Sequence, residues 1–258
     1  MATIKELMNL EGRVSVVTGG ATGLGYQMAT GLAEAGSNVV ICSRKLEHCE
    51  QAAQRLEKLG VTALALACDV TKVDQVEAMK DAVMRKFGRV DVLVNNAGRA
   101  WIAPPEDTPL DGWQKVLDLN ITAPFICAQV LGREMIKVQR GRIINIASVA
   151  GLVGRDAKTY NSIAYCASKG ALVNFTRDLA VKWAPHNIRV NAICPGFFVT
   201  PLNEKMLEQT MQTVLRGIPL GRTGGPDDLK GIVVLLASDA SNFMTGAIIP
   251  VDGGAVAW

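Results

Sequence analysis

Short runs of apolar residues alternate along the whole chain with longer segments in which apolar residues recur every three or four positions. The short runs are typical of buried strands, and the longer segments are typical of amphipathic helices. This pattern predicts strands over residues 13–18, 38–42, 62–68, 90–94, 142–147, 188–193 and 247–251. It predicts helices over residues 24–35, 46–59, 73–87, 110–138, 164–183, 201–216 and 227–238. We expect Pro124 to bend the longest of these helices, because proline lacks the N–H of a helical hydrogen bond.

The alternation of strand and helix is not interrupted by a Pro/Ser-rich linker or by a repeat. Such an alternation indicates parallel strands joined by helical crossovers. The sequence therefore predicts a single α/β domain over residues 1–258, with a Rossmann-type doubly wound parallel sheet and helices on both faces. Ligands of such sheets bind beyond the carboxyl ends of the strands, so functional residues are expected directly after strands.

Composition and charge narrow the class of protein. The net charge is +3, from 27 basic and 24 acidic residues, and no run of five basic residues occurs, which argues against nucleic acid as a partner. No apolar stretch reaches eighteen residues and residues 1–10 contain no signal-peptide core, so we expect a cytoplasmic protein with no membrane partner. The six cysteines form no CxxC pair and the two histidines have no metal-ligand spacing. They predict buried, reduced thiols and no metal site.

A glycine-rich turn follows the first predicted strand, with glycines at positions 19, 23 and 25. Glycine lets the backbone approach a pyrophosphate closely, and the following helix presents N–H groups to it. The turn therefore predicts a dinucleotide site, although a tight strand–helix connection without a ligand would also use glycine.

The end of the second predicted strand bears on the choice of dinucleotide. An acidic residue there binds the ribose 2′-hydroxyl of NAD(H), but this chain has Ser43 and Arg44 at that place. A guanidinium and a hydroxyl suit a 2′-phosphate, which predicts NADP(H) in preference to NAD(H). The alternative is that Arg44 is a solvated residue at the start of the next helix.

Candidate acid–base residues follow the fifth predicted strand. Ser148 comes directly after it, and Tyr165 and Lys169 are one helical turn apart on the same face of the next predicted helix. A tyrosine is too weak an acid to serve as a base at neutral pH unless a nearby cation favours its phenolate. Lys169 and a cationic nicotinamide would provide such charges. A Tyr–Lys pair alone is common on helix surfaces, so the prediction depends on its companions.

Taken together, the motifs resemble those of the short-chain dehydrogenase/reductase family, from Gly12 to Gly254. The matching residues are Thr18-Gly19-x-x-x-Gly23-x-Gly25, Asn95-Asn96-Ala97-Gly98, Ser148, Tyr165-x-x-x-Lys169, Pro195-Gly196 and Val251-Asp252-Gly253-Gly254. Within the family, the chain is similar to gluconate 5-dehydrogenase-like and tropinone-reductase-like members.

The resemblance implies a role for each matching residue. Tyr165 is expected to be the acid/base, Lys169 to lower its pKa and hold the nicotinamide ribose, Ser148 to orient the substrate oxygen, and Asn120 to complete a proton relay through water. The implied cofactor site consists of Gly19, Thr22, Gly23, Leu24, Gly25, Ser43, Arg44, Asp69, Val70, Asn96, Ala97, Gly98, Tyr165, Lys169, Pro195, Gly196 and Thr200. Many relatives that use NADP(H) carry a basic residue where this chain has Thr22, so the preference depends on Arg44.

The resemblance also implies a homotetramer, built on the helices around residues 110–138 and 164–183, and a reaction between a secondary alcohol and a ketone. We expect a small-molecule substrate enclosed by a lid at about residues 197–216. Candidate wall residues are Trp101, Val153, Phe197, Phe198 and Met206, with Arg155 and Lys158 as candidate partners of an anionic substrate end.

Three alternatives remain. A 3-oxoacyl-carrier-protein reductase would need a basic docking patch, to which Arg133, Lys137 and Arg140 could contribute. A non-catalytic dinucleotide sensor could lose the Tyr or the Lys, whereas Asn120, Ser148, Tyr165 and Lys169 are all present. A structural protein with an empty fold would leave these four polar groups unexplained.

Overall fold

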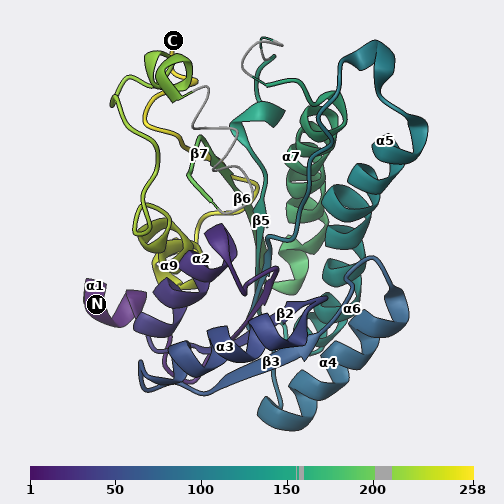
Figure 1. Cartoon of the computed structure of the whole chain (residues 1–258). Coiled ribbons are helices and arrows are strands. Elements are labelled where there is room, and N and C mark those ends of the chain that lie inside the picture. The colour runs from purple at the N-terminus through teal and green to yellow at the C-terminus, as the bar shows by residue number, and fades with distance from the viewer. Residues whose placement is uncertain (155, 157–159, 201–210) are drawn as a thin grey trace.

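A seven-stranded, fully parallel sheet forms the centre of the molecule (Figure 1). The computed structural model describes residues 1–154, 156, 160–200 and 211–258. The strand order is β3-β2-β1-β4-β5-β6-β7, so the direction of winding reverses between β1 and β4. The strands are β1 (Val14–Thr18), β2 (Asn38–Ser43), β3 (Ala63–Ala67), β4 (Val92–Asn95), β5 (Gly141–Ile146), β6 (Ile188–Pro195) and β7 (Ile248–Val251).

Helices cover both faces of the sheet, as predicted (Figure 1). One face packs against α2 (Gly23–Glu34), α3 (Leu46–Glu57) and α9 (Lys230–Ala237), and the other packs mainly against α4 (Val73–Phe87), α6 (Ala123–Lys137) and α7 (Ile163–Trp183). Every residue of β1, β4 and β5 is buried, because both faces are covered. This explains why these strands are continuous apolar runs rather than alternating ones.

The longest predicted helix is interrupted, but not where the sequence placed the bend. The helix α5 (Leu110–Leu117) passes into a π-helical turn over Asp118–Thr122 before α6 begins, and Pro124 lies in the first turn of α6. The wider turn accommodates Pro124, whose missing N–H would otherwise interrupt an α-helical ladder. The predicted bend at Pro124 is therefore corrected to a π turn that contains Asn120.

The N-terminal segment contains a helix that the apolar pattern did not predict, α1 (Ile4–Met8). Thr3 and Glu6 form a reciprocal capping box, in which the Thr3 hydroxyl accepts from the Glu6 N–H and the Glu6 carboxylate accepts from the Thr3 N–H. The Thr-x-x-Glu spacing was the available signal.

Two further predictions concern whole segments. Residues 211–216 are helical, as expected for the end of the predicted helix over 201–216, and the rest of that prediction lies outside the described residues.

All six cysteines are free; five are buried and Cys166 is half-buried. In the part of the chain that the structure describes, no helix is both long and apolar enough to cross a membrane.

Candidate active site

The glycine-rich turn lies at the carboxyl end of β1, next to the point where the winding of the sheet reverses. Gly19 has a φ of +64°, which favours glycine, and its N–H donates to the Cys42 carbonyl at 2.8 Å. The first helical residues, Gly23 to Gly25, follow directly, so the amino end of α2 opens onto this edge of the sheet. The structure thus confirms the predicted strand–turn–helix context of the turn.

A second loop, after β4, holds the glycine-rich turn in place. The Asn96 amide donates to the carbonyls of Thr18 at 2.9 Å and Gly19 at 3.2 Å. The Thr18 hydroxyl in turn accepts from the N–H groups of Asn96 at 3.0 Å and Ala97 at 3.1 Å. A Cβ on Gly25 would overlap both the Asn96 amide and the Gly19 carbonyl. The two loops therefore form a tight backbone cradle, which suits a pyrophosphate.

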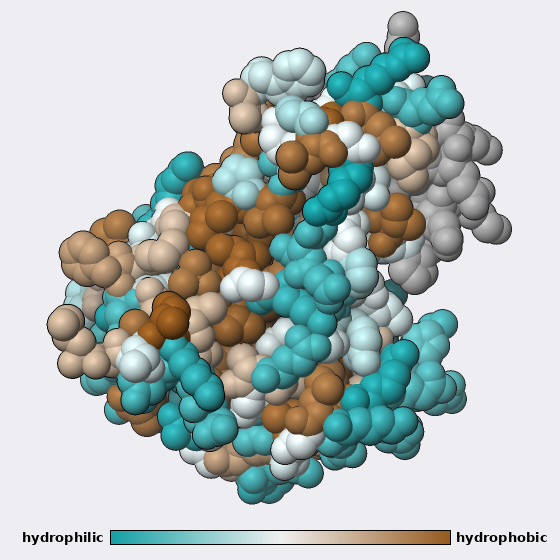
Figure 2. All heavy atoms as spheres, turned by 90° about the vertical axis from the view of Figure 1, so that its left-hand side faces the viewer, coloured by the Kyte–Doolittle hydropathy of each residue, from teal (hydrophilic) through white to brown (hydrophobic). Residues whose placement is uncertain are grey.

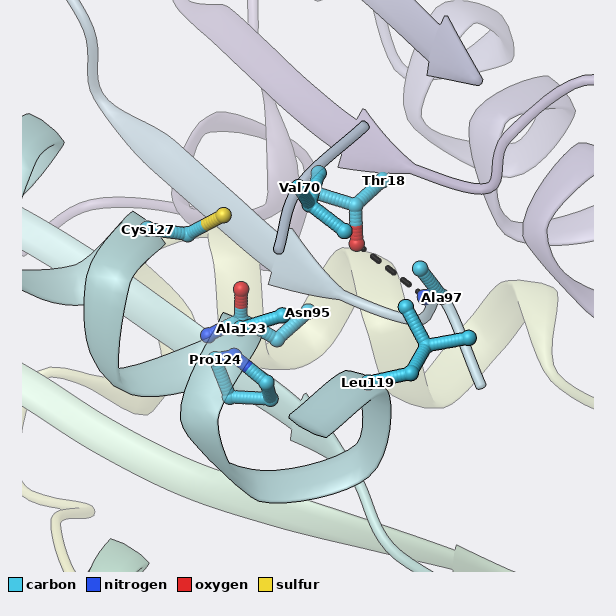
Figure 3. A pocket seen from close by; sticks show the side chains of 8 residues that line it. All are labelled: Thr18, Val70, Asn95, Ala97, Leu119, Ala123, Pro124 and Cys127. Carbon is cyan, nitrogen blue, oxygen red and sulfur yellow. Dashed lines mark hydrogen bonds between the residues drawn. The ribbon is translucent and has the colours of Figure 1, made fainter. Parts of the chain in front are cut away.

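A small pocket extends from this cradle toward α6 (Figure 3). Figure 3 shows Thr18, Val70, Asn95 and Ala97 facing Leu119, with Ala123, Pro124 and Cys127 closing the far side. Val70 and Ala97 were predicted to contact the cofactor. Thr18 and Leu119, which line the same pocket, were not among the predicted cofactor residues; they lie directly before Gly19 and Asn120.

The polar residues at the ends of β2 and β3 lie beside this region. The Ser43 hydroxyl is 3.1 Å from both the Lys45 carbonyl and the Cys49 sulfur. Burial raises the pKa of Asp69, but hydrogen bonds from Thr71 and the positive charges of Arg44 and Lys72 outweigh it and lower that pKa. Arg44 is exposed and follows β2 directly, and its charge reaches Asp69 after β3.

Ser148, Tyr165 and Lys169 converge at the carboxyl ends of β5 and β6. The Ser148 hydroxyl caps the short helical turn Val149–Gly151 through the Ala150 N–H at 3.1 Å, and it also bonds Tyr165. Lys169 is 4% exposed; its ammonium donates to the Ile146 carbonyl at 2.7 Å and lies 5.5 Å from the centre of the Tyr165 ring. The three predicted side chains therefore form one site.

The electrostatics of this site come mainly from burial. Burial raises the pKa of Tyr165, and the hydrogen bond from Ser148 offsets only part of that rise. Burial also lowers the pKa of Lys169 to about 8. The Lys169 ammonium donates to the Ile146 carbonyl, and the lowering of the Tyr165 pKa by Lys169 stays a prediction.

Asn120 ties the cofactor loop to the helix that carries Tyr165. Its Oδ1 accepts from the Arg99 N–H and its Nδ2 donates to the Arg99 carbonyl, both at 2.9 Å. The same Nδ2 donates to the Ser168 hydroxyl at 2.9 Å, and that hydroxyl donates to the Tyr165 carbonyl at 2.8 Å. Both Nδ2 hydrogens are used in this way, so the fully buried side chain acts as a clamp.

The remaining predicted cofactor residues lie around the cradle. Pro195 ends β6, and the Gly196 N–H donates to the Val251 carbonyl at 3.0 Å. The Thr200 methyl group is 3.6 Å from where a Cβ would sit on Gly23. A Cβ on Gly98 would lie 3.6 Å from the Lys169 amine, which joins the cradle to the catalytic group.

Two predicted substrate walls pack closely against neighbouring residues. Phe198 is 3% exposed and its ring packs against Gly224, and it also lines the second hollow described below. Trp101 packs against Gly112 of α5 and keeps only part of its surface exposed. Arg155, Lys158 and Met206 lie outside the described residues, as does much of the predicted lid. A second hollow, formed by residues after β6 and β7, contains Phe197, Leu220 and Arg222.

A parallel α/β sheet with a glycine cradle at its switch point and a Ser-Tyr-Lys group beside it is the arrangement of a nucleotide-dependent oxidoreductase. A family model described as enoyl-(acyl carrier protein) reductase matches residues 19–256. The NAD-dependent glycerol dehydrogenase of Listeria innocua is 38% identical, over 95% of this chain and 94% of that protein. The 3-oxoacyl-[acyl-carrier-protein] reductase of Thermotoga maritima is 36% identical, over 96% of this chain and 100% of that protein.

Solved structures agree with these similarities. A short-chain type dehydrogenase/reductase from Mycobacterium marinum has a TM-score of 0.95 at 37% identity, covering 98% of this chain and 99% of the other. A putative NAD(P)-dependent gluconate 5-dehydrogenase from Beutenbergia cavernae, with bound NADP, has a TM-score of 0.91 at 35% identity, covering 98% and 100%. The chain belongs to the short-chain dehydrogenase/reductase family and is an NAD(P)-dependent enzyme that acts on CH–OH groups.

Proposed function

We propose that this enzyme interconverts a small secondary alcohol and its ketone with NADP(H), and that Tyr165 is the general acid/base. The observation that carries the proposal is the convergence of Ser148, Tyr165 and Lys169 beside the glycine cradle. When bound, the nicotinamide supplies or accepts the hydride.

Each protein group has a separate task in this reaction. In the reducing direction, the Ser148 hydroxyl holds the carbonyl oxygen and the Tyr165 phenol gives that oxygen its proton while the carbonyl carbon gains the hydride. The secondary alcohol leaves, and the Tyr165 phenolate regains a proton from solvent. The burial that raises the pKa of Tyr165 favours the protonated phenol, which suits the reducing direction.

Asn120 has a task that its side chain cannot perform. Because the amide group is committed to Arg99 and Ser168, a water relay through this residue must use the main-chain carbonyl. We therefore assign the relay contact to the Asn120 carbonyl.

NADP(H) is favoured by the charge on the rim of the adenosine site. Arg44 lies near Asp69, and no acidic residue stands at the end of β2 to repel a 2′-phosphate. Relatives include an NAD-dependent enzyme, so the preference is a property to be measured for this chain.

The carrier-protein alternative receives less support from the surface. Of the three residues expected to dock an acidic carrier, Arg133 lies 3.5 Å from Glu77 and Lys137 lies 2.8 Å from Glu134. Arg140 lies 3.8 Å from Asp239. Each cation thus has a nearby carboxylate, which weakens the case for a docking patch. We favour a free small-molecule ketone, uncharged or with one negative charge.

A panel assay that follows NADPH absorbance tests the proposal. Cyclic ketones, keto-sugars, keto-acids and acetoacetyl thioesters are compared with wild-type enzyme and with Tyr165→Phe. We expect a small ketone to be the best substrate. The Phe variant should lose at least about 100-fold in kcat while NADPH binding stays near normal, because only the proton donor is removed. An acetoacetyl thioester preferred by tenfold would favour the carrier-protein alternative, and a Phe variant with a tenth of wild-type kcat would refute the role of Tyr165.

A further inference from the structure

A second tyrosine packs against Tyr165. The ring of Tyr160 lies 5.6 Å from the ring of Tyr165, centre to centre, with the planes inclined by 66°. This edge-to-face geometry is favourable for aromatic pairs and restricts the rotation of both rings. Tyr160 is half-buried, and the described contact of its ring is with Tyr165.

The segment that carries Tyr160 is anchored on both sides. The Tyr160 N–H donates to the Asp156 carbonyl at 2.9 Å. The next residue, Asn161, accepts from the Ala103 N–H at 3.1 Å, and Ala103 forms an isolated parallel bridge with Ser162. The Ser162 carbonyl then accepts from the Cys166 N–H in the first turn of α7. The loop after β4 and the start of α7 thus hold Tyr160 beside Tyr165.

Tyr160 is not itself equipped for acid–base work. Burial, and then the neighbouring Tyr165, raise its pKa far above the ordinary value. The cation–π contact with Lys169 and the hydrogen bond with Ser148 both go to Tyr165. The two phenols are therefore unequal: one has the partners of a catalytic group, and the other has a ring placed to hold it.

We propose that Tyr160 is a positioning residue, whose ring holds Tyr165 in the orientation from which the phenol exchanges a proton with the substrate. The inference rests on the proposed role of Tyr165. It assigns the effect to the ring of Tyr160 rather than to its hydroxyl, and to proton transfer rather than to cofactor binding.

The test compares Tyr160→Phe, which keeps the ring, with Tyr160→Leu, which removes it. The control is Tyr26→Phe, since Tyr26 contacts Arg55 of α3 and lies outside the site. We expect Tyr160→Phe and Tyr26→Phe to keep kcat within about twofold. Tyr160→Leu should lose about tenfold in kcat, with the KM for NADP⁺ unchanged, because misplacing a reacting group lowers the rate while the contacts of the glycine cradle are kept.

The dependence of kcat on pH distinguishes a positioning role of Tyr160 from a purely structural one, which would leave it unchanged. Removing the Tyr160 ring reduces the burial of Tyr165, so the pKa of Tyr165 should fall. In alcohol oxidation, the low-pH limb of the kcat–pH profile should then move to lower pH for Tyr160→Leu. It should stay in place for Tyr160→Phe. Equal losses in both variants, or a Leu variant with wild-type kcat and an unmoved limb, would overturn the proposal.

A direct titration separates this proposal from the proposed function. The chain has three tyrosines, so the ¹³Cζ resonances of tyrosine-labelled enzyme with NADP⁺ bound can be assigned by the three Tyr→Phe variants. Tyr160→Leu should lower the titration midpoint of the Tyr165 resonance even if Tyr165→Phe proves active. If the Leu variant fails to fold, Tyr160→Met replaces it, with thermal melting as the check. An unchanged Tyr165 midpoint counts against the proposal in either variant.

Discussion

At the scale of single residues, the site depends on a few groups whose surroundings differ from water. Lys169 is buried and Tyr165 is half-buried, and the loss of solvation shifts the pKa of each in the direction that favours its neutral form. Arg44, in contrast, is exposed, and its charge acts on Asp69. The proposed roles of the two kinds of residue, in proton transfer and in cofactor recognition, can each be tested with one substitution.

The first residue-scale prediction concerns cofactor choice. Wild-type enzyme should show a higher kcat/KM with NADPH than with NADH, and Arg44→Asp should reverse that order, because the variant places a like charge opposite the 2′-phosphate. Steady-state kinetics with both cofactors measure this, with Arg55→Asp as a control on the neighbouring helix. Equal efficiency of the wild type with the two cofactors would mean that Arg44 is only a surface residue.

The second residue-scale prediction concerns the effect of Lys169 on the free energy of unfolding. Its pKa is lowered to about 8, below the ordinary value of lysine, so the folded state resists protonation that the unfolded state accepts. The free energy of unfolding should therefore contain a destabilising part that is complete below pH 8. That part is relieved as the pH rises from 8 toward 10, by up to about 3 kcal/mol.

Lys169→Met tests this sign. The variant should be inactive, more stable than wild type at pH 7, and similar in stability to wild type near pH 10. Urea unfolding at several pH values gives the comparison. A stability difference that does not shrink between pH 8 and 10 would contradict a lowered lysine pKa.

At the scale of elements, the π turn between α5 and α6 organises the site. It places Asn120 where one side chain bonds both the N–H and the carbonyl of Arg99 and reaches Ser168 of α7. Because Arg99 directly follows the loop Asn96–Gly98, the turn fixes this loop against α7, the helix that carries Tyr165 and Lys169. A regular α-helix through this region could not both accommodate Pro124 and keep Asn120 in the same position relative to Arg99 and Ser168.

Asn120→Ala should show how much the hydrogen bonds of the Asn120 side chain contribute to the free energy of unfolding. It removes three hydrogen bonds and leaves the main-chain groups of Arg99 without these partners, so we expect a loss of about 2–4 kcal/mol in unfolding free energy. The KM for the cofactor should rise with it, because the loop next to Arg99 loses its support. Ser168→Ala removes one of the three bonds and should cost about 1 kcal/mol. Similar stabilities of the two variants would show that the bonds to Arg99 contribute little.

At the scale of the whole molecule, the outer surfaces bear on assembly. Figure 2 shows a broad apolar area on the side of the molecule that carries α9 and β7. β7 is the last strand of the sheet. On the predicted contact helices, Phe125 of α6 is 48% exposed and Val181 of α7 is 75% exposed. Two separate apolar surfaces suit two different two-fold contacts, which together would produce the expected homotetramer.

Phe125→Lys tests the contact through α6. We expect wild-type enzyme to be tetrameric in multi-angle light scattering and the variant to be dimeric, because a charge would be buried in one of the two contacts. Ile4→Lys, at an exposed residue of α1, is the matched control and should remain tetrameric. A wild-type mass equal to one chain would refute the tetramer.

Much of the fold was predictable because its strands are buried on both faces. The continuous apolar runs of β1, β4 and β5 identify strands at once, and the helices between them require parallel connections. The predicted boundaries differ from the observed ones by a few residues, since helix and strand ends depend on local capping. The exception, α1, was too short for a periodic pattern and was marked only by its capping box.

The sequence by itself determined the class of fold, the cradle glycines and the grouping of Ser148, Tyr165 and Lys169, because these follow from periodicity, spacing and motif. The tertiary structure decided which side chains meet. It buried Phe198 against Gly224, used the Asn120 amide as a clamp and placed Tyr160 against Tyr165. It also determined that the Lys169 amine points at Ile146. Such contacts depend on the packing of segments far apart in the chain, and on the burial that results, which no local pattern encodes.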